Sequence, residues 1–150
     1  MTLHETILAD IKNAMKAKEA EKLTVLRSIH SRFSTALLEK KVAKGEDQVL
    51  TDQEMLEILL NEAKKRKDSI QSFGDAGRPE LAAAEKMELD IIETYLPTQL
   101  SPEETRAEVE KILAEQSPTD MGAAMKIVMA ELRGKADTKF ASEIVKQKFQ

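Results

Sequence analysis

A helix-start signal that occurs three times constrains the fold of this chain more than any other feature. In each case a Ser or Thr is followed three residues later by Glu, the capping-box pattern that satisfies the first backbone donors of a helix. The pairs are Thr2 with Glu5, Thr51 with Glu54, and Ser101 with Glu104. Apolar residues at helical spacing follow each pair, so the sequence predicts a helix at each of these positions.

Apolar periodicity and chain breakers predict four helices before Pro97. They span residues 2 to about 18, about 21 to 42, 51 to 74, and 79 to 95. The side chains expected to face inward are Leu3, Ile7, Leu8, Ile11 and Met15, then Leu23, Leu26, Ile29, Phe33 and Leu37, then Met55, Ile58, Leu59, Ile70 and Phe73, then Leu81, Ala84, Ile91 and Ile92. Aromatic residues make up only 3% of the chain, whereas Ala, Glu, Lys and Leu are abundant. This composition favours helices over sheet, and we predict an all-α fold.

A domain boundary is predicted at Pro97, which ends the fourth helix. Ser101-Pro102-Glu103-Glu104 then starts a new helix with a cap, a first-turn proline and a capping-box Glu together. We therefore expect an N-terminal domain of about four helices at residues 1–97 and a small three-helix bundle at residues 98–150.

The last thirty residues are predicted to form two short amphipathic helices that meet at Gly134. The residues on their apolar faces are Met121, Met125, Val128, Met129 and Leu132, then Phe140, Ile144, Val145 and Phe149. Arg133 places a cation at the negative end of the first helix dipole, and Gly134 can adopt a left-handed conformation. Asp137 is the predicted N-cap of the second helix.

Four motifs carry a resemblance to a known family. They are Arg66-Lys67-Asp68-Ser69-Ile70, Tyr95-Leu96-Pro97, Asp120-Met121-Gly122 and Gly134-Lys135-Ala136-Asp137. The Met-rich helix, the Gly-Lys-Ala-Asp turn and the following helix resemble the C-terminal tail domain of the B subunit of the tRNA-dependent glutamine amidotransferases (GatB). Nearly the whole chain resembles the free-standing YqeY family, which carries such a tail.

The GatB tail is associated with gripping the tRNA body. The resemblance therefore implies an accessory tRNA-binding module, linked to carbon–nitrogen ligase activity with glutamine as amido-nitrogen donor. Its partner would be tRNA or an amidotransferase–tRNA complex. The alternative is a non-enzymatic helical adaptor that binds another protein.

The charge of the chain is unevenly distributed, although the formal net charge is −4. Residues 1–45 carry +4, residues 46–120 carry −11, and residues 121–150 carry +3. A nucleic acid would be repelled by the acidic middle and would have to bind at one end.

The turn before the last helix is the first candidate site for a nucleic acid. A helix N-terminus presents unpaired N–H groups and a partial positive charge. The candidate binding residues are Lys126, Arg133, Lys135 and Lys139. A plain interhelical turn is the competing interpretation, because Asp137 already accepts from some of these donors and adds a negative charge.

A second candidate is the basic run Lys64, Lys65, Arg66 and Lys67. Four consecutive residues point to all sides of a helix, so the run cannot form one continuous basic face. In the competing interpretation, a carboxylate such as Glu85 or Glu88 on the next helix holds Arg66, and the lysines are solvated.

No catalytic, metal-binding or cofactor-binding motif is predicted on this chain. There is no Cys, the two His residues are on separate predicted helices, and no Gly-rich phosphate loop precedes a helix. The chain should therefore be an accessory protein and should not perform the ligase chemistry alone. The missing Cys, signal peptide and membrane-length apolar run predict a cytoplasmic location.

Overall fold

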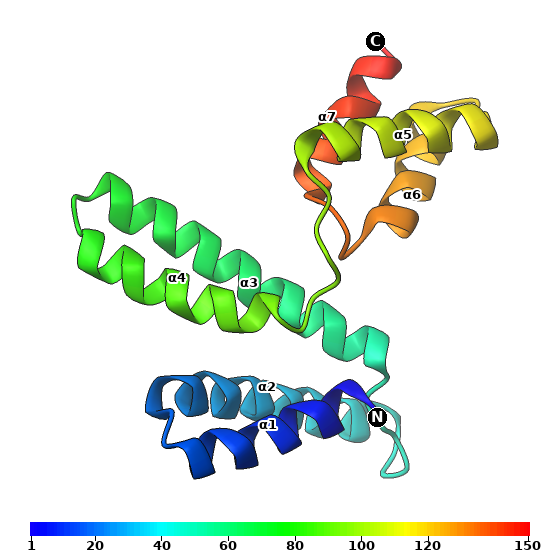
Figure 1. Cartoon of the computed structure of the whole chain (residues 1–150). Coiled ribbons are helices and arrows are strands. Elements are labelled where there is room, and N and C mark those ends of the chain that lie inside the picture. The colour runs from blue at the N-terminus through cyan, green and yellow to red at the C-terminus, as the bar shows by residue number, and fades with distance from the viewer. The chain divides into compact units, whose positions relative to one another are not determined.

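The computed structural model describes residues 1–150 and contains seven α-helices and no strand (Figure 1). The prediction of an all-α fold is therefore confirmed. The helices are α1 (Leu3–Ala17), α2 (Ala20–Lys44), α3 (Asp52–Asp75), α4 (Pro79–Glu93), α5 (Pro102–Gln116), α6 (Met121–Leu132) and α7 (Thr138–Lys148). The chain divides into two compact units, Met1–Leu96 and Pro97–Gln150.

The three capping boxes form as the sequence predicts. Thr2 Oγ1 accepts from the backbone N–H of Glu5 at 3.1 Å, and Thr2 N–H donates to the Glu5 carboxylate at 2.9 Å. The same reciprocal pair of hydrogen bonds starts α3 and α5. These side chains satisfy donors that have no partner inside the helix, which is why local sequence locates the helix starts.

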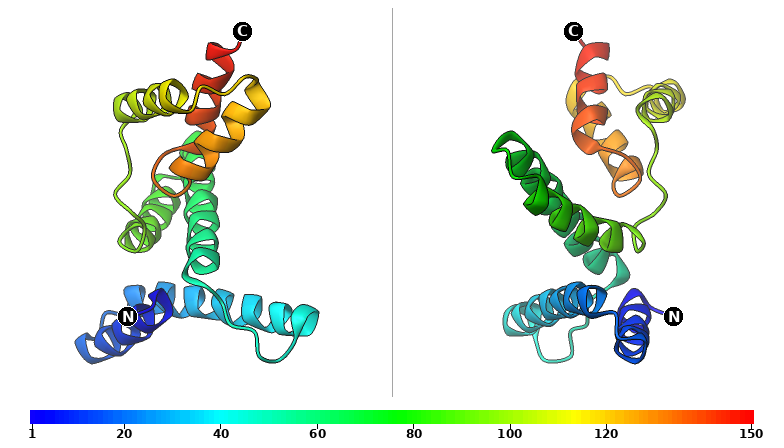
Figure 2. Two further views of the ribbon diagram at one scale, coloured as in Figure 1. Left: turned by 90° about the vertical axis from the view of Figure 1, so that its right-hand side faces the viewer. Right: turned by 60° about the vertical axis from the view of Figure 1, so that its left-hand side comes forward.

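The first unit consists of two helical hairpins, α1 with α2 and α3 with α4, which pack on each other (Figures 1 and 2). Left-handed residues allow the tight reversals: Lys18 has φ 58° after α1, and Gly77 has φ 69° before Pro79 starts α4. The shared core consists of Ile7, Val25, Ile29, Phe33, Met55, Leu59, Ala63, Leu89 and Ile92.

Several residues expected in the interior of the first unit lie at its surface. Leu8 and Met15 of α1 are 39% and 52% exposed. Ala84 of α4 is also exposed, and Leu37 of α2 is only partly buried. The predicted apolar stripes were therefore wider than the faces that the neighbouring helices cover.

The second unit packs α5, α6 and α7 around a separate apolar core (Figure 1). The core residues are Val109, Ile112, Ala124, Val128, Leu132, Ala136, Ala141, Ile144 and Val145. The prediction of an inward position is wrong for two residues. Met121 is 44% exposed, and Phe149 follows the end of α7 and is 37% exposed. Ala124 of α6, which was not among the predicted inward residues, is fully buried in this core.

Candidate functional site

The turn between α6 and α7 is built around Gly134. This residue is buried and has φ 81°, the left-handed conformation that the sequence predicts. The N–H groups of Lys135 and Ala136 donate to the carbonyl of Leu132, at 2.9 and 3.1 Å. Ala136 is only 6% exposed, so the turn is anchored in the core on both sides of Lys135.

Asp137 caps α7, also as predicted. Its Oδ1 accepts from the backbone N–H groups of Lys139 at 2.9 Å and Phe140 at 3.3 Å. The cap satisfies two of the donors that a free helix N-terminus would offer to an anion, and it adds one negative charge. A ligand at this end of α7 would therefore depend on the surrounding lysines.

The lysines of the candidate site are available for binding. Lys126, Lys135 and Lys139 are exposed, and none of them forms an ion pair with a carboxylate. Arg133, also exposed, follows Lys126 by seven residues, so the two lie on the same side of α6, about 10 Å apart along its axis. Their role in nucleic-acid binding stays a prediction.

The fold adds one cation that the sequence analysis missed. The guanidinium of Arg106, on α5, lies over the ring of Phe140 at 5.8 Å from its centroid. Phe140 directly follows Lys139 in the first turn of α7, and Arg106 is exposed and has no ion-pair partner. Arg106 belongs to the acidic part of the sequence and is about 30 residues away from the turn along the chain. No local sequence pattern could therefore have indicated its contact with Phe140.

Unlike the lysines near α7, two residues of the basic run of α3, Lys65 and Arg66, form ion pairs with the buried Glu62. Arg66 donates to the Glu62 carboxylate through a side-chain hydrogen bond, and its Nε lies 3.4 Å from Glu88 Oε2 on α4. Lys65 Nζ and Arg32 Nε lie 3.4 and 3.3 Å from Glu62 Oε1. The predicted pairing of Arg66 with a carboxylate of the next helix is thus present.

Glu62 is a charged residue held inside the first unit, with its side chain 7% exposed. Burial raises the pKa of this carboxyl, but the hydrogen bond from Arg66 and the charges of Lys65, Arg66 and Arg32 outweigh it and lower the pKa below its ordinary value. The carboxylate is therefore ionised and ties α2 to α3, and Arg66 extends the network to Glu88 on α4. The remaining members of the run, Lys64 and Lys67, are exposed and unpaired.

The two histidines come together although they belong to different helices. The ring centroids of His4 and His30 are 5.2 Å apart, and the rings of His4 and Phe33 are nearly perpendicular, with centroids 6.0 Å apart. No group of three or more His, Cys, Asp or Glu side chains is placed to hold a metal ion. None of the helices is long and apolar enough to cross a membrane.

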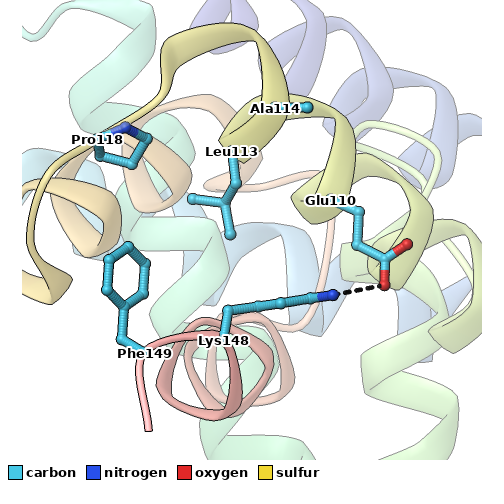
Figure 3. A pocket seen from close by; sticks show the side chains of 6 residues that line it. All are labelled: Glu110, Leu113, Ala114, Pro118, Lys148 and Phe149. Atoms are coloured by element: carbon cyan, nitrogen blue, oxygen red, sulfur yellow. Dashed lines mark ion pairs between the residues drawn. The ribbon is translucent and has the colours of Figure 1, made fainter.

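A hollow of about 380 Å³ lies between the end of α5 and the end of α7. Figure 3 shows Leu113, Pro118 and Phe149 around it, with the ion pair of Lys148 and Glu110 at 3.3 Å along one edge. The lining combines apolar side chains with one pair of charges that neutralise each other. No nucleophile or unpaired base lies in it.

Comparison with known proteins finds a match to the YqeY family over nearly the whole chain. The family model described as Yqey-like protein matches residues 4–149. The relatives include the mitochondrial protein named Altered inheritance of mitochondria protein 41 from three fungi. The Pyrenophora tritici-repentis protein is 28% identical over 145 residues, which is 93% of this chain and 76% of the relative.

The Vanderwaltozyma and Eremothecium proteins match slightly less of the chain. The Vanderwaltozyma polyspora protein is 32% identical over 125 residues, 82% of this chain and 65% of its own length. The Eremothecium gossypii protein is 29% identical over 126 residues, 82% of this chain and 66% of its own length. The chain thus spans 65% to 76% of the length of these relatives.

The prediction of a cytoplasmic location is contradicted by these relatives, because all three are named as mitochondrial proteins. The prediction rested on the missing cysteines, the missing secretory signal peptide and the missing membrane-length segment. None of these properties distinguishes the cytoplasm from another aqueous compartment inside the cell, so they were an unsuitable basis for it.

Proposed function

Because this chain belongs to the Yqey-like protein family, we propose that it is an accessory RNA-binding module whose second unit binds tRNA weakly. The contacts would be made by Lys126, Arg133, Lys135 and Lys139 around the start of α7. The observation that carries the proposal is the availability of the lysines: the final thirty residues have a net charge of +3, and Lys126, Lys135 and Lys139 are exposed without a carboxylate partner.

Arg106 extends this surface onto α5. Its guanidinium is held over Phe140, and a stacked arginine keeps its N–H donors directed outward for phosphate oxygens. Helices α5, α6 and α7 thus each carry at least one exposed cation of the proposed surface. Contacts to several phosphates give an affinity that depends on salt and little on sequence, which fits a module that grips the body of an RNA.

The link to an amidotransferase is the finer part of the proposal and rests on the resemblance of the tail to the GatB tail domain. In this role the chain would hold tRNA for a partner enzyme that carries out the carbon–nitrogen ligase reaction with glutamine as nitrogen donor. The chain itself would supply binding and orientation.

Filter binding of tRNA at several salt concentrations tests the proposal. Replacing Lys135 and Lys139 by Ala removes about two phosphate contacts, so the logarithmic salt slope should fall by about 0.9 per contact. The matched control replaces Lys64 and Lys67, which are exposed and unpaired on α3, by Ala. The control variant should bind as the wild type does.

Two results would reject this function. One is the absence of measurable tRNA binding at low salt, and the other is binding that depends on Lys64 and Lys67 but is indifferent to Lys135 and Lys139. Either result would remove the reason for assigning RNA contacts to the second unit.

We also propose that the two units are separate domains joined near Pro97. The separate apolar cores and the complete helix restart at Ser101 support this. Limited proteolysis of the whole chain should cleave between residues 97 and 100 before it cleaves any helix. Cleavage of the helices at the same rate would argue for one domain.

A helical adaptor for a protein partner is the second candidate function. The observation in its favour is a set of exposed aliphatic side chains: Leu38 and Val42 of α2 are 63% and 79% exposed, and Val49 of the following loop is 68% exposed. An apolar contact of this kind would be nearly independent of salt, so the same salt series separates it from RNA binding.

A further inference from the structure

The residues that lead from Pro97 into α5 are joined to the α6–α7 turn by hydrogen bonds. The side-chain Nε2 of Gln99 donates to the carbonyl of Gly134 at 2.7 Å and to the carbonyl of Pro97 at 2.9 Å. The backbone N–H of Leu100 donates to the carbonyl of Lys135 at 2.8 Å. Two consecutive donors thus meet two consecutive acceptors.

The contact closes the base of the second unit. It connects positions 35 residues apart, on either side of α5 and α6, and Leu100 also packs against the apolar core. By contrast, Thr98 is exposed and no hydrogen bond holds it. Thr98 thus has no hydrogen bond, whereas Gln99 and Leu100, the next two residues, both do.

We propose that Gln99 and Leu100 form a clip that positions the Gly134–Lys135 turn and leaves Thr98 as the residue of the connection that no hydrogen bond holds. Both backbone carbonyls of the turn are occupied by the clip. Their partial negative charges are thereby directed toward the connecting segment, while Lys135 remains exposed. Gln99 is a positioning residue in this arrangement, since it adds no charge to the surface.

Hydrogen exchange of the Leu100 amide, followed by NMR in the full chain, tests the clip without any ligand. Gln99→Ala removes one of the two donors, and we expect it to speed exchange at Leu100 by about threefold to tenfold. Gln99→Glu should have a larger effect, because a carboxylate would face the Gly134 carbonyl oxygen. Thr98→Ala is the matched control and should leave the rate unchanged.

Exchange at Leu100 that is unprotected in the wild type, or that is the same in all three variants, would overturn the clip. The amides of α5 and α7 should stay protected throughout, which shows that the variants are folded.

The effect of the clip on RNA rests on the proposed function and has its own measurement. Gln99→Ala should weaken tRNA binding severalfold without changing the salt slope, whereas Lys135→Ala should lower both the affinity and the slope. Unchanged affinity in Gln99→Ala, together with faster exchange at Leu100, would overturn the positioning role. Failure of the wild type to bind tRNA would reject the proposed function, and the exchange rates would still decide whether the clip exists.

Discussion

The two basic segments of this chain, Lys64–Lys67 and Arg133–Lys139, have different surroundings. In the first, Lys65 and Arg66 face Glu62, and Arg66 also reaches Glu88 on the neighbouring helix. In the second, Lys135 and Lys139 have no carboxylate partner. A basic run beside an acidic helix thus contributes to the fold, whereas a basic turn at the end of a small bundle remains available for a ligand. The comparison predicts that loss of the ion pairs around Glu62 lowers stability, whereas loss of the exposed lysines Lys135 and Lys139 lowers binding.

Replacing Glu62 by Ala should have the largest effect on stability. The variant leaves the Arg66 side chain, which is 13% exposed, buried without its closest carboxylate. Breaking a buried ion pair from one side costs several kcal/mol, and we expect a loss of about 3 kcal/mol in the free energy of unfolding of the first unit. Urea unfolding followed by the fluorescence of Tyr95 measures it, because this is the only Tyr and there is no Trp.

Glu80→Ala is the control for Glu62→Ala. Glu80 pairs with Arg78 at 3.0 Å, but both side chains are more than half exposed, so the change should stay within about 0.5 kcal/mol. Equal effects of the two substitutions would show that the Glu62 network is no stronger than a surface pair. The distinction between the two basic segments would then fail.

Gly134→Val should have the next largest effect, on the second unit. A side chain at φ 81° is strained, and a β-branched residue more than others, so we expect a loss of about 2 kcal/mol. Amide exchange in α6 and α7 reports it. Gly74→Ala is the comparison, followed by amide exchange in α3, because a Cβ there meets no atom within 4 Å and its φ is not positive, so that variant should not be destabilised. Normal protection of α6 and α7 in Gly134→Val would argue against this account of the turn.

At acidic pH, the wild type and Glu62→Ala should differ less in their free energy of unfolding. Because the folded state lowers the pKa of Glu62 below its ordinary value of 4.5, the ionised carboxylate stabilises the first unit above that pH. This contribution is lost as the pH falls through the lower pKa of the folded state. Urea unfolding at pH 7 and at successively lower pH should therefore show the two free energies converging. A constant difference would mean that Glu62 acts through packing alone.

Local sequence was sufficient for the features that depend on neighbouring residues. The capping boxes, the positive φ of Gly134 and the cap formed by Asp137 involve residues at most three positions apart, so their chemistry can be read directly. The contact between Arg66 and Glu88 was also accessible, because a charge on an apolar stripe of one helix requires a partner on the next.

Features that depend on how helices meet could not be predicted in the same way. The apolar pattern of α2 does not reveal that Leu38 and Val42 remain uncovered. Nor does the sequence indicate that Arg106 reaches Phe140, or that Gln99 reaches Gly134, since these pairs are about 35 residues apart and result from the packing of three helices. The cytoplasmic location failed for another reason, because no residue pattern had been identified that could specify a compartment.

Asp137→Asn should have the smallest effect and tests the turn most directly. Asn can accept the same bonds from the Lys139 and Phe140 N–H groups, so the cap is kept while the negative charge is lost. We expect stability to fall by at most about 0.5 kcal/mol through the helix dipole. The lost carboxylate would no longer repel a phosphate about 8 Å away, and in water this repulsion is about 0.5 kcal/mol. The affinity for tRNA at low salt should therefore rise about two- to threefold.

The matched control for this prediction is Asp120→Asn. Asp120 caps α6 in the same way, with Oδ1 accepting from the Ala123 N–H at 2.7 Å, so both variants change the net charge of the chain by the same amount at a helix start. If only Asp137→Asn raises the affinity, the phosphate lies near the start of α7. If both raise it equally, the RNA responds to the charge of the whole unit, and if neither does, the turn makes no contact with RNA.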